Sequence, residues 1–336
     1  MKNYIQMIKN NENLAQSEIE VVMRSIMSGQ ASKGEVADFL LSLQAKGPTV
    51  EEITGAAKIM RQFVVGIQSN HKVILDTCGT GGDKKNTFNI STLTALVVAG
   101  AGVVVAKHGN RSVSSQCGSA DLLEALGVNL NVEESHLKEC LDAVGLVFLF
   151  AQKLHPAMKY VAPIRKELAV ETIFNILGPL TNPANATHQM VGVYSRELIE
   201  PIAYVLKNLG LKKAIVVHGS DGLDEITTTG KTFICEYNGR DIISYDISPD
   251  ELGVPVAQPL DLVGGNLKTN VRIFQEILNG QQGPRRDIVV LNAAYALYLS
   301  GKAGNISDGI KLAKESIDSG KAQRKLRELK DFTSSV

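Results

Sequence analysis

The chain has no tryptophan, few other aromatic residues and no excess of charge of either sign. Its 35 lysines and arginines are matched by 35 aspartates and glutamates, so its formal net charge at pH 7 is zero. Proteins that bind nucleic acids or membrane surfaces without sequence preference normally carry a basic excess. The balance therefore argues against both kinds of partner and favours an enzyme that acts on small molecules.

Cysteine is scarce as well. The chain has four, Cys78, Cys117, Cys140 and Cys235, and none of them forms a C-x-x-C pair. Disulfide scaffolds are typical of much shorter secreted chains, and a zinc site needs ligands at closer spacing. We therefore expect reduced thiols in a cytosolic protein.

Long hydrophobic runs are also absent. The longest apolar stretch, 144–151, is far shorter than the roughly 18 apolar residues expected of a membrane-spanning helix. Residues 1–10 show neither the apolar core nor the cleavage pattern of a secretory signal. We expect a cytoplasmic protein that has no membrane partner.

The first 65 residues have the pattern of packed helices. Ser17, Ser32 and Thr49 are each followed by a glutamate three residues later, as in a capping box at a helix start. Apolar residues recur behind them at helical spacing, and Gly29 and Gly47 stand where two of the helices should end. The helices carry no residues typical of catalysis, so packing and an oligomer contact are the roles we expect of them.

From residue 72 onward, short β-branched runs alternate with helical stretches. We expect strands at 73–75, 103–106, 190–194 and 214–217. Alternation of this kind predicts a mostly parallel sheet whose ligands bind beyond the carboxyl ends of its strands. The predicted class is α/β, with a small all-helical domain and a larger α/β domain.

The helical pattern returns at about 133–180 and again in the last 70 residues. We therefore predict a helical domain from residues 1–70 with inserted helices from about 133–180. The α/β domain is predicted to comprise 71–132 and 181–336.

Two polar loops follow the first two predicted strands, at 76–83 (DTCGTGGD) and 107–115 (KHGNRSVSS). A strand that breaks into glycines and hydroxyls before a helix exposes free backbone N–H groups at the positive end of that helix, which favours anions. Two such loops so close together predict a ligand with more than one phosphate. Neither loop fits G-x-G-x-x-G or G-x-x-x-x-G-K-[ST], so neither a dinucleotide fingerprint nor a P-loop is present.

Side chains near these loops suit phosphate binding. Lys107 supplies a point charge and Arg111 a bidentate fork, while His108 could act as a base, a donor or a stacking surface. Neutral donors surround the next expected helix start, namely Thr87, Asn89, Ser91 and Thr92. Ser114, Ser115 and Cys117 lack a G-x-S-x-G motif, which argues against covalent catalysis.

A third polar loop, 218–225, follows the strand predicted at 214–217. Its adjacent carboxylates, Asp224 and Glu225, suit Mg²⁺, which takes one or two protein carboxylates and completes its coordination with phosphate oxygens and water. Arg165 becomes relevant if a second substrate carries a carboxylate. The residues alone thus predict a Mg²⁺-assisted enzyme that acts on a phosphorylated small molecule.

Several longer motifs stand out, namely 79–83 (GTGGD), 86–92 (NTFNIST), 107–115, 118–121 (GSAD), 172–183 (TIFNILGPLTNP) and 223–225 (LDE). Together they resemble the signature of the anthranilate phosphoribosyltransferase family. The resemblance extends from the N-terminal helices to about residue 326. Family members transfer the phosphoribosyl group of phosphoribosyl pyrophosphate to anthranilate with Mg²⁺, pair a helical with an α/β domain, and usually form homodimers through their helical parts.

The resemblance implies a role for each matching residue. Phosphoribosyl pyrophosphate would be held by Gly79, Gly82, Asp83, Thr87, Asn89, Ile90, Ser91, Thr92, Lys107, His108, Gly109, Asn110, Arg111, Ser112, Val113, Ser114, Ser115 and Ser119. Two Mg²⁺ ions per monomer would be held by Ser91, Asp224 and Glu225. Anthranilate would be bound or admitted by Gly79, His108, Asn110, His155, Arg165 and Pro179. Catalysis would depend on Lys107, Arg165, Asp224 and Glu225.

A few positions depart from the family pattern. Gln116 and Cys117 replace a commoner Lys-Ser pair, Glu171 stands where arginine is usual, and Ala169 where glycine is usual. Two other functions remain open on this fold: a pyrimidine nucleoside phosphorylase, and a non-catalytic relative that binds nucleic acid.

Overall fold

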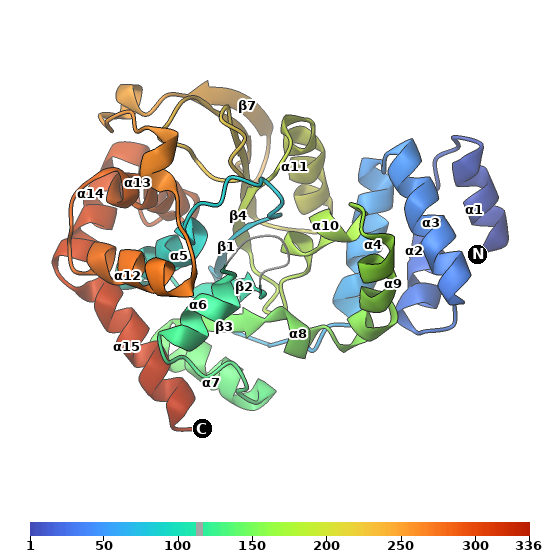
Figure 1. Ribbon diagram of the computed structural model, residues 1–336, viewed down its shortest axis with the longest axis horizontal. Helices are drawn as coiled ribbons and strands as arrows, with labels where there is room; N and C mark the ends of the chain where they lie inside the picture. The colour runs from blue at the N-terminus through green and yellow to red at the C-terminus, as the bar shows by residue number, and fades with distance from the viewer. Residues whose placement is uncertain (112–116) are drawn as a thin grey trace.

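The computed structural model describes residues 1–111 and 117–336. Four N-terminal helices stand at one end of the molecule, and a sheet with its covering helices forms the larger part (Figure 1). Four predicted site residues, Ser112, Val113, Ser114 and Ser115, lie outside the described residues, as does Gln116. Among the described residues, no helix combines the length and the apolar character needed to cross a membrane.

The N-terminal bundle confirms the expected helices. They are α1 (Lys2–Lys9), α2 (Gln16–Met27), α3 (Lys33–Lys46) and α4 (Val50–Gln62). Ser32 and Thr49 cap their helices as predicted, each accepting from the N–H of the glutamate three residues on. The box at Ser17 was wrong, because α2 begins earlier and Glu18 accepts from the N–H of Ala15 instead.

The sheet has seven strands in the order β3-β2-β1-β4-β5-β6-β7. The first five in that order are mutually parallel, β6 pairs antiparallel with β5, and β7 pairs antiparallel with β6. This confirms a mostly parallel sheet. The strands are β1 (Leu75–Gly79), β2 (Val105–Gly109), β3 (Leu146–Phe150), β4 (His188–Gly192), β5 (Lys213–Gly219), β6 (Thr232–Tyr237) and β7 (Ile242–Ile247).

Helices cover both faces of this sheet. One face packs against α5 and α13, and α14 and α15 lie behind them, whereas α11 covers the other face next to α4. The helices of this domain are α5 (Ile90–Gly100), α6 (Ser119–Ala125), α7 (Glu134–Val144), α11 (Ile199–Asn208), α12 (Leu267–Leu278), α13 (Pro284–Leu299), α14 (Ile306–Asp318) and α15 (Lys321–Ser334).

After β3 the chain crosses to the helical bundle and returns. The crossing segment contains α8 (Ala151–Leu154), α9 (Ala162–Leu168), α10 (Phe174–Leu177) and the 3-10 helices at Pro156–Tyr160 and Pro179–Thr181. Of these, α9 contacts α3, and α10 contacts α4. The helical insertion expected from about residue 133 thus starts later in the structure, because α7 packs on β3 and β3 is the edge strand of the sheet.

The two domains are joined through α4. One hydrophobic core cluster runs without a break from the helical bundle to the sheet face under α11. The half-buried side chain of Arg61 on α4 adds polar contacts, since its Nε donates to the carbonyl of Leu180 at 2.7 Å and its Nη1 to the carbonyl of Leu209 at 3.4 Å. Burial lowers the pKa of Arg61 to about 10.

Candidate active site

A cavity of about 240 Å³ opens at the carboxyl ends of β1 and β2. All three predicted polar loops contribute to it, so Asp83, Lys107 and Glu225 line one cavity despite their separation in sequence. The predicted residues that line it are Gly79, Gly82, Asp83, Thr87, Asn89, Ile90, Ser91, Thr92, Lys107, His108, Gly109, Asn110, Ser119, Asp224 and Glu225. It is also lined by Cys78, Gly81, Lys84, Asn86, Phe88 and Cys117, which the sequence did not single out as ligands.

The loop after β1 depends on left-handed backbone conformations. Gly81 and Gly82 have φ angles of 64° and 84°, and Lys84 and Asn86 adopt φ angles of 58° and 55° although they carry side chains. Such conformations cost free energy and concentrate at ligand-binding loops. The loop is held by the N–H of Gly81, which donates to Asp224 Oδ2 at 2.8 Å.

The N-terminus of α5 points into the same cavity. Its first turn offers backbone donors, and the N–H of Ser91 donates to Glu225 Oε1 at 3.1 Å. Among the described residues, two buried polar atoms here, Asn89 Oδ1 and Thr92 Oγ1, have no hydrogen-bond partner. Buried polar atoms are normally paired, so unpaired ones at a helix N-terminus indicate a place for a polar ligand.

Lys107 lies at the floor of the cavity, with only 3% of its surface exposed. Its Nζ donates to the carbonyl of Thr77 at 2.6 Å and to Ser91 Oγ at 3.4 Å. The ammonium group is therefore held in a fixed position at the cavity, where its charge acts on a bound ligand.

The acidic side chains of Asp83, Asp224 and Glu225 line the same cavity. Burial and the nearby charge of Asp83 raise the pKa of Asp224 to about 7, and burial with the charge of Asp224 raises the pKa of Glu225 well above its usual range. Among the described residues, no three His, Cys, Asp or Glu side chains form a complete metal site. Two repelling carboxylates with the Ser91 hydroxyl nearby nevertheless fit Mg²⁺, which needs few protein ligands when phosphate oxygens supply the rest.

A buried polar network that the sequence did not reveal lies beneath this site. Asp76 is fully buried, and its Oδ1 accepts from the backbone N–H of His108 at 3.2 Å. Its Oδ2 accepts from Asn182 Nδ2 at 2.8 Å and from Gln189 Nε2 at 3.2 Å. Asp76 thereby connects β1, β2 and β4 with the segment that returns from the helical domain.

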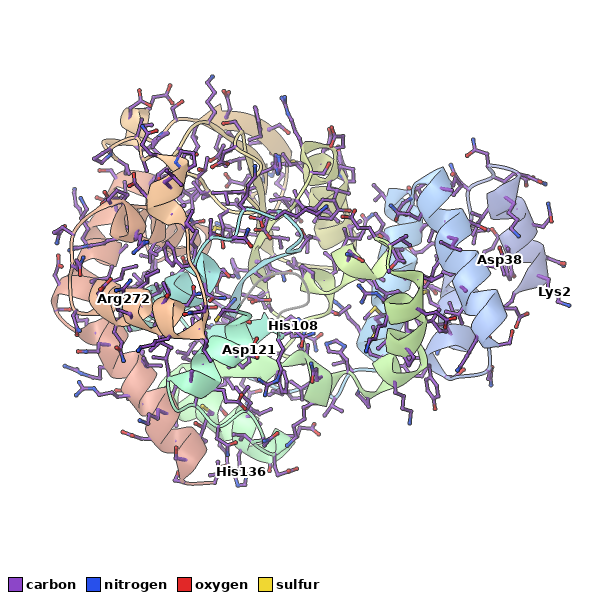
Figure 2. All side chains as sticks on the ribbon, in the orientation of Figure 1. Lys2, Asp38, His108, Asp121, His136 and Arg272 are labelled. Carbon is purple, nitrogen blue, oxygen red and sulfur yellow. The ribbon has the colours of Figure 1, made fainter. Side chains whose placement is uncertain are left out.

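Two predicted histidines meet at the edge of the cavity. His108 Nε2 and His155 Nε2 are 3.1 Å apart, and both side chains are buried. Burial is the main cause that lowers the pKa of His108 to about 3 and that of His155 to about 4. Figure 2 shows His108 on the side of the α/β domain that is nearer the helical domain.

Arg165 and Pro179 come from the crossing segment and do not line the cavity. The Nη2 of Arg165 donates to Asn175 Oδ1 at 3.0 Å, and its guanidinium lies 5.7 Å from the centre of the Phe174 ring. Among the described residues, its Nε is a buried donor without a partner. The carbonyl of Pro179 accepts from Gln189 Nε2.

Arg111 is engaged elsewhere and does not line the cavity. Its Nη1 lies 2.8 Å from Asp121 Oδ1 and 2.8 Å from Glu124 Oε2 on α6. A phosphate would have to compete with these two carboxylates for the guanidinium. Ser119, at the start of α6, donates from its hydroxyl to the carbonyl of Asn110 at 3.2 Å.

The structure describes three of the residues that depart from the family pattern. Ala169 follows α9 with a φ of 51°, which explains a preference for glycine there. Burial raises the pKa of Tyr194, and the charge of Glu171 and its hydrogen bond to the Tyr194 side chain raise it further. Burial raises the pKa of Cys117 to about 11, which keeps its thiol protonated at neutral pH.

Two family models match the chain and together cover most of it. Residues 71–323 match "Glycosyl transferase family, a/b domain", and residues 2–64 match "Glycosyl transferase family, helical bundle domain". The division corresponds to the sheet domain and the N-terminal bundle.

Several relatives match this chain over its whole length and share one name. The chain is 51% identical over 335 residues to the anthranilate phosphoribosyltransferase of Acetivibrio thermocellus, covering 100% of this chain and 97% of that protein. The enzyme of that name from Thermus thermophilus has a TM-score of 0.93 at 40% identity, covering 98% and 99% of the two chains.

The Saccharomyces cerevisiae enzyme, solved in complex with PRPP and Mg, has a TM-score of 0.91 at 30% identity and covers 100% of this chain and 99% of its own. The same yeast enzyme, solved in complex with 4-fluoroanthranilate, has a TM-score of 0.87 at 30% identity and covers 96% and 94%.

Proposed function

Because this chain belongs to the anthranilate phosphoribosyltransferase family and has that activity, we propose that its cavity is where the phosphoribosyl group is transferred. The reaction joins the phosphoribosyl group of 5-phosphoribosyl 1-pyrophosphate to the amine of anthranilate and releases pyrophosphate, a step of tryptophan biosynthesis. The observation that carries the proposal is the convergence of Asp83, Lys107 and Glu225 on one cavity.

Phosphoribosyl pyrophosphate lies, in this proposal, between the loop after β1 and the N-terminus of α5. Asn89 Oδ1 and Thr92 Oγ1, which lack partners among the described residues, support this placement, because a hydroxylated sugar phosphate can supply hydrogen bonds to them. Lys107 is held by Thr77 and Ser91, so its charge is preorganised to offset the negative charge that grows on the departing pyrophosphate. Because the ammonium does not have to move, this stabilisation needs no rearrangement during the reaction.

Magnesium would be held by Asp224, Glu225 and Ser91, and we propose two ions per monomer as the family resemblance implies. The residues fit because the two carboxylates repel each other when no cation lies between them. When bound, Mg²⁺ neutralises phosphate charge and so makes pyrophosphate a better leaving group.

Anthranilate would be oriented by Arg165, whose buried Nε–H is unpaired among the described residues. A guanidinium with a free donor suits a carboxylate, and Asn175 and Phe174 fix its direction. His108, His155, Asn110, Pro179 and Gly79 would form the path by which the aromatic ring reaches the sugar.

The side chains around the anthranilate path supply orientation more than proton transfer. An aromatic amine is neutral at pH 7 and can attack the anomeric carbon without prior deprotonation. A pKa of about 3 makes His108 a poor base at that pH, so we assign it to shaping the path. Proximity of the two substrates then accounts for the part of the acceleration that these residues provide.

We also propose that the protein is a homodimer joined through its helical domain. Val21 on α2 and Leu41 on α3 are 56% and 45% exposed, so the helical domain offers apolar side chains for such a contact. Sedimentation equilibrium should give a dimer for the wild type and a monomer for Val21→Glu combined with Leu41→Glu.

One assay separates the transferase from its rivals. Anthranilate fluorescence should fall when the protein is mixed with phosphoribosyl pyrophosphate and Mg²⁺, while thymidine and uridine should not undergo phosphorolysis. Phosphorolysis without loss of anthranilate would contradict the proposal, and a salt-dependent gel shift would support nucleic-acid binding instead.

A further inference from the structure

Two paired glycines end the strands that lie next to Asp224. Gly79 ends β1, Gly192 ends β4, and the two are cross-strand partners in the parallel sheet. The chain at Asp224 lies directly over both. A Cβ at Gly79 would lie 2.2 Å from Asp224 Oδ2, and a Cβ at Gly192 would lie 1.5 Å from the carbonyl oxygen of Asp224.

Position 192 requires glycine because a side chain would not fit there, and not because of its backbone conformation. It is absent from the glycines that adopt a positive φ, and it sits in a regular strand. The same hypothetical Cβ would lie 2.3 Å from the carbonyl carbon of Asp224. Since the obstruction is main chain, no side-chain rotation relieves it, and the segment that carries Asp224 and Glu225 must move.

The other side of this segment is held by Asn292 on α13, which is fully buried. Its Oδ1 accepts from the N–H of Ile226 at 3.0 Å, and its Nδ2 donates to the carbonyl of Ile226 at 2.8 Å. The Nδ2 group also donates to the carbonyl of Ile288 at 2.8 Å, which fixes the amide on its own helix. Asn292 thus pairs with the residue after Glu225 much as a neighbouring strand would.

We propose that Gly192 and Asn292 are positioning residues that clamp residues 224–226 from two sides and so set the spacing of the two carboxylates. The inference rests on the proposed role of Asp224 and Glu225 in holding Mg²⁺. Mg²⁺ demands near-octahedral coordination at distances of about 2.0–2.1 Å, so small displacements of a ligand weaken binding. Neither positioning residue lines the cavity.

The test measures metal binding directly. Equilibrium dialysis of radioactive Mn²⁺ at a fixed concentration of phosphoribosyl pyrophosphate gives the excess metal held by the protein. Gly192→Ala and Asn292→Leu should each weaken Mn²⁺ retention by roughly tenfold or more, the usual effect of removing support behind a metal ligand. The Mg²⁺ concentration for half-maximal activity should rise in parallel, while the KM for anthranilate changes little.

Matched variants separate positioning from loss of stability. Gly304→Ala adds a Cβ where nothing lies within 4 Å, and Ser316→Ala removes a buried hydrogen bond to Val97, so both should retain Mn²⁺ like the wild type. If Gly192→Ala does not fold, Asn292→Asp supplies the measurement, because it keeps an acceptor for the Ile226 N–H and loses the donor. Wild-type Mn²⁺ retention in folded Gly192→Ala or Asn292→Leu would overturn the inference.

A double-mutant cycle tests the route through Asp224. If Gly192 acts by placing Asp224, combining Gly192→Ala with Asp224→Asn should weaken Mn²⁺ binding little more than Asp224→Asn alone. Additive losses would show that Gly192 acts elsewhere. Unchanged Mn²⁺ retention in Asp224→Asn itself would instead refute the metal role in the proposed function, which distinguishes the two failures.

Discussion

His108 on β2 and His155 on the crossing segment meet through a contact of 3.1 Å between their Nε2 atoms, at the proposed anthranilate path. His108 also interacts with the backbone of Gly178, and in the contact between the two rings one Nε2 atom donates and the other accepts. A proton on both Nε2 atoms would break this contact. The pair therefore holds β2 against the crossing segment as long as one of the two Nε2 atoms carries no proton.

This pair predicts how stability depends on pH. The folded-state pKa values of about 3 and about 4 lie below the ordinary histidine value, so the unfolded chain binds more protons between pH 4 and 6.5. Stability should therefore be fully present above pH 6.5 and fall as the pH is lowered. Chemical denaturation at a series of pH values gives the free energy of unfolding. Its slope against pH should be smaller in His155→Gln than in the wild type, by up to about 1.4 kcal/mol per pH unit.

His188 provides the matched control. Burial also lowers its pKa to about 4, and it lies at the start of β4, at the opposite end of the sheet from the cavity. His188→Gln should flatten the pH profile of stability in the same way but leave the KM for anthranilate unchanged. If the free energy of unfolding of both variants depends on pH as steeply as that of the wild type, the rings of His155 and His188 are not held neutral in the folded protein.

Replacement of Arg165 should separate the two substrates. Arg165→Ala removes the guanidinium proposed to bind the anthranilate carboxylate, a charged hydrogen bond with a contribution of about 1.5–3 kcal/mol. The KM for anthranilate should rise by roughly tenfold to a hundredfold, with little change in that for phosphoribosyl pyrophosphate. Arg272→Ala, on the exposed face of α12, should alter neither. An effect confined to phosphoribosyl pyrophosphate would refute the assignment.

The acidic pair should control the response to magnesium. Asp224→Asn with Glu225→Gln keeps the shape of the site but removes both charges, so steady-state turnover should fall at least about a hundredfold and lose its dependence on Mg²⁺. In the presence of a chelator, the melting temperature of this double variant should not lie below that of the wild type, since two repelling carboxylates have been removed. Mg²⁺ dependence that matches the wild type would exclude these residues as ligands.

The sequence was sufficient to place the cavity, because its determinants are local. Glycines and hydroxyls after β-branched runs predict loops at strand ends, and parallel strands bring those ends to one edge. Even so, Asp76 and Lys107 lie within β1 and β2 and not in the loops after them. Their polar side chains are tolerated inside buried strands because the structure supplies partners from other segments.

The local sequence pattern cannot reveal these hydrogen-bond partners, because they lie far away along the chain. Asn182 reaches Asp76 from 106 residues away, and Asn292 reaches Ile226 from 66 residues away. An isolated asparagine or glycine has no periodicity, so neither Asn292 nor Gly192 stands out in the chain. The strand β3 was also missed, because a short apolar run within a helical region reads equally well as part of a buried helix.

Ala169 offers a prediction that concerns strain and not chemistry. It is exposed and ends α9 in the left-handed region, with φ 51° and ψ 30°, where a Cβ costs about 1–2 kcal/mol. Glycine removes that cost but adds freedom to the unfolded chain, which offsets about 0.4–1 kcal/mol of the gain. Ala169→Gly should therefore stabilise the protein by about 0.5–1 kcal/mol in chemical denaturation. Ala162→Gly, at the exposed start of the same helix, should destabilise it, and a loss of stability in both variants would show that Ala169 is not strained.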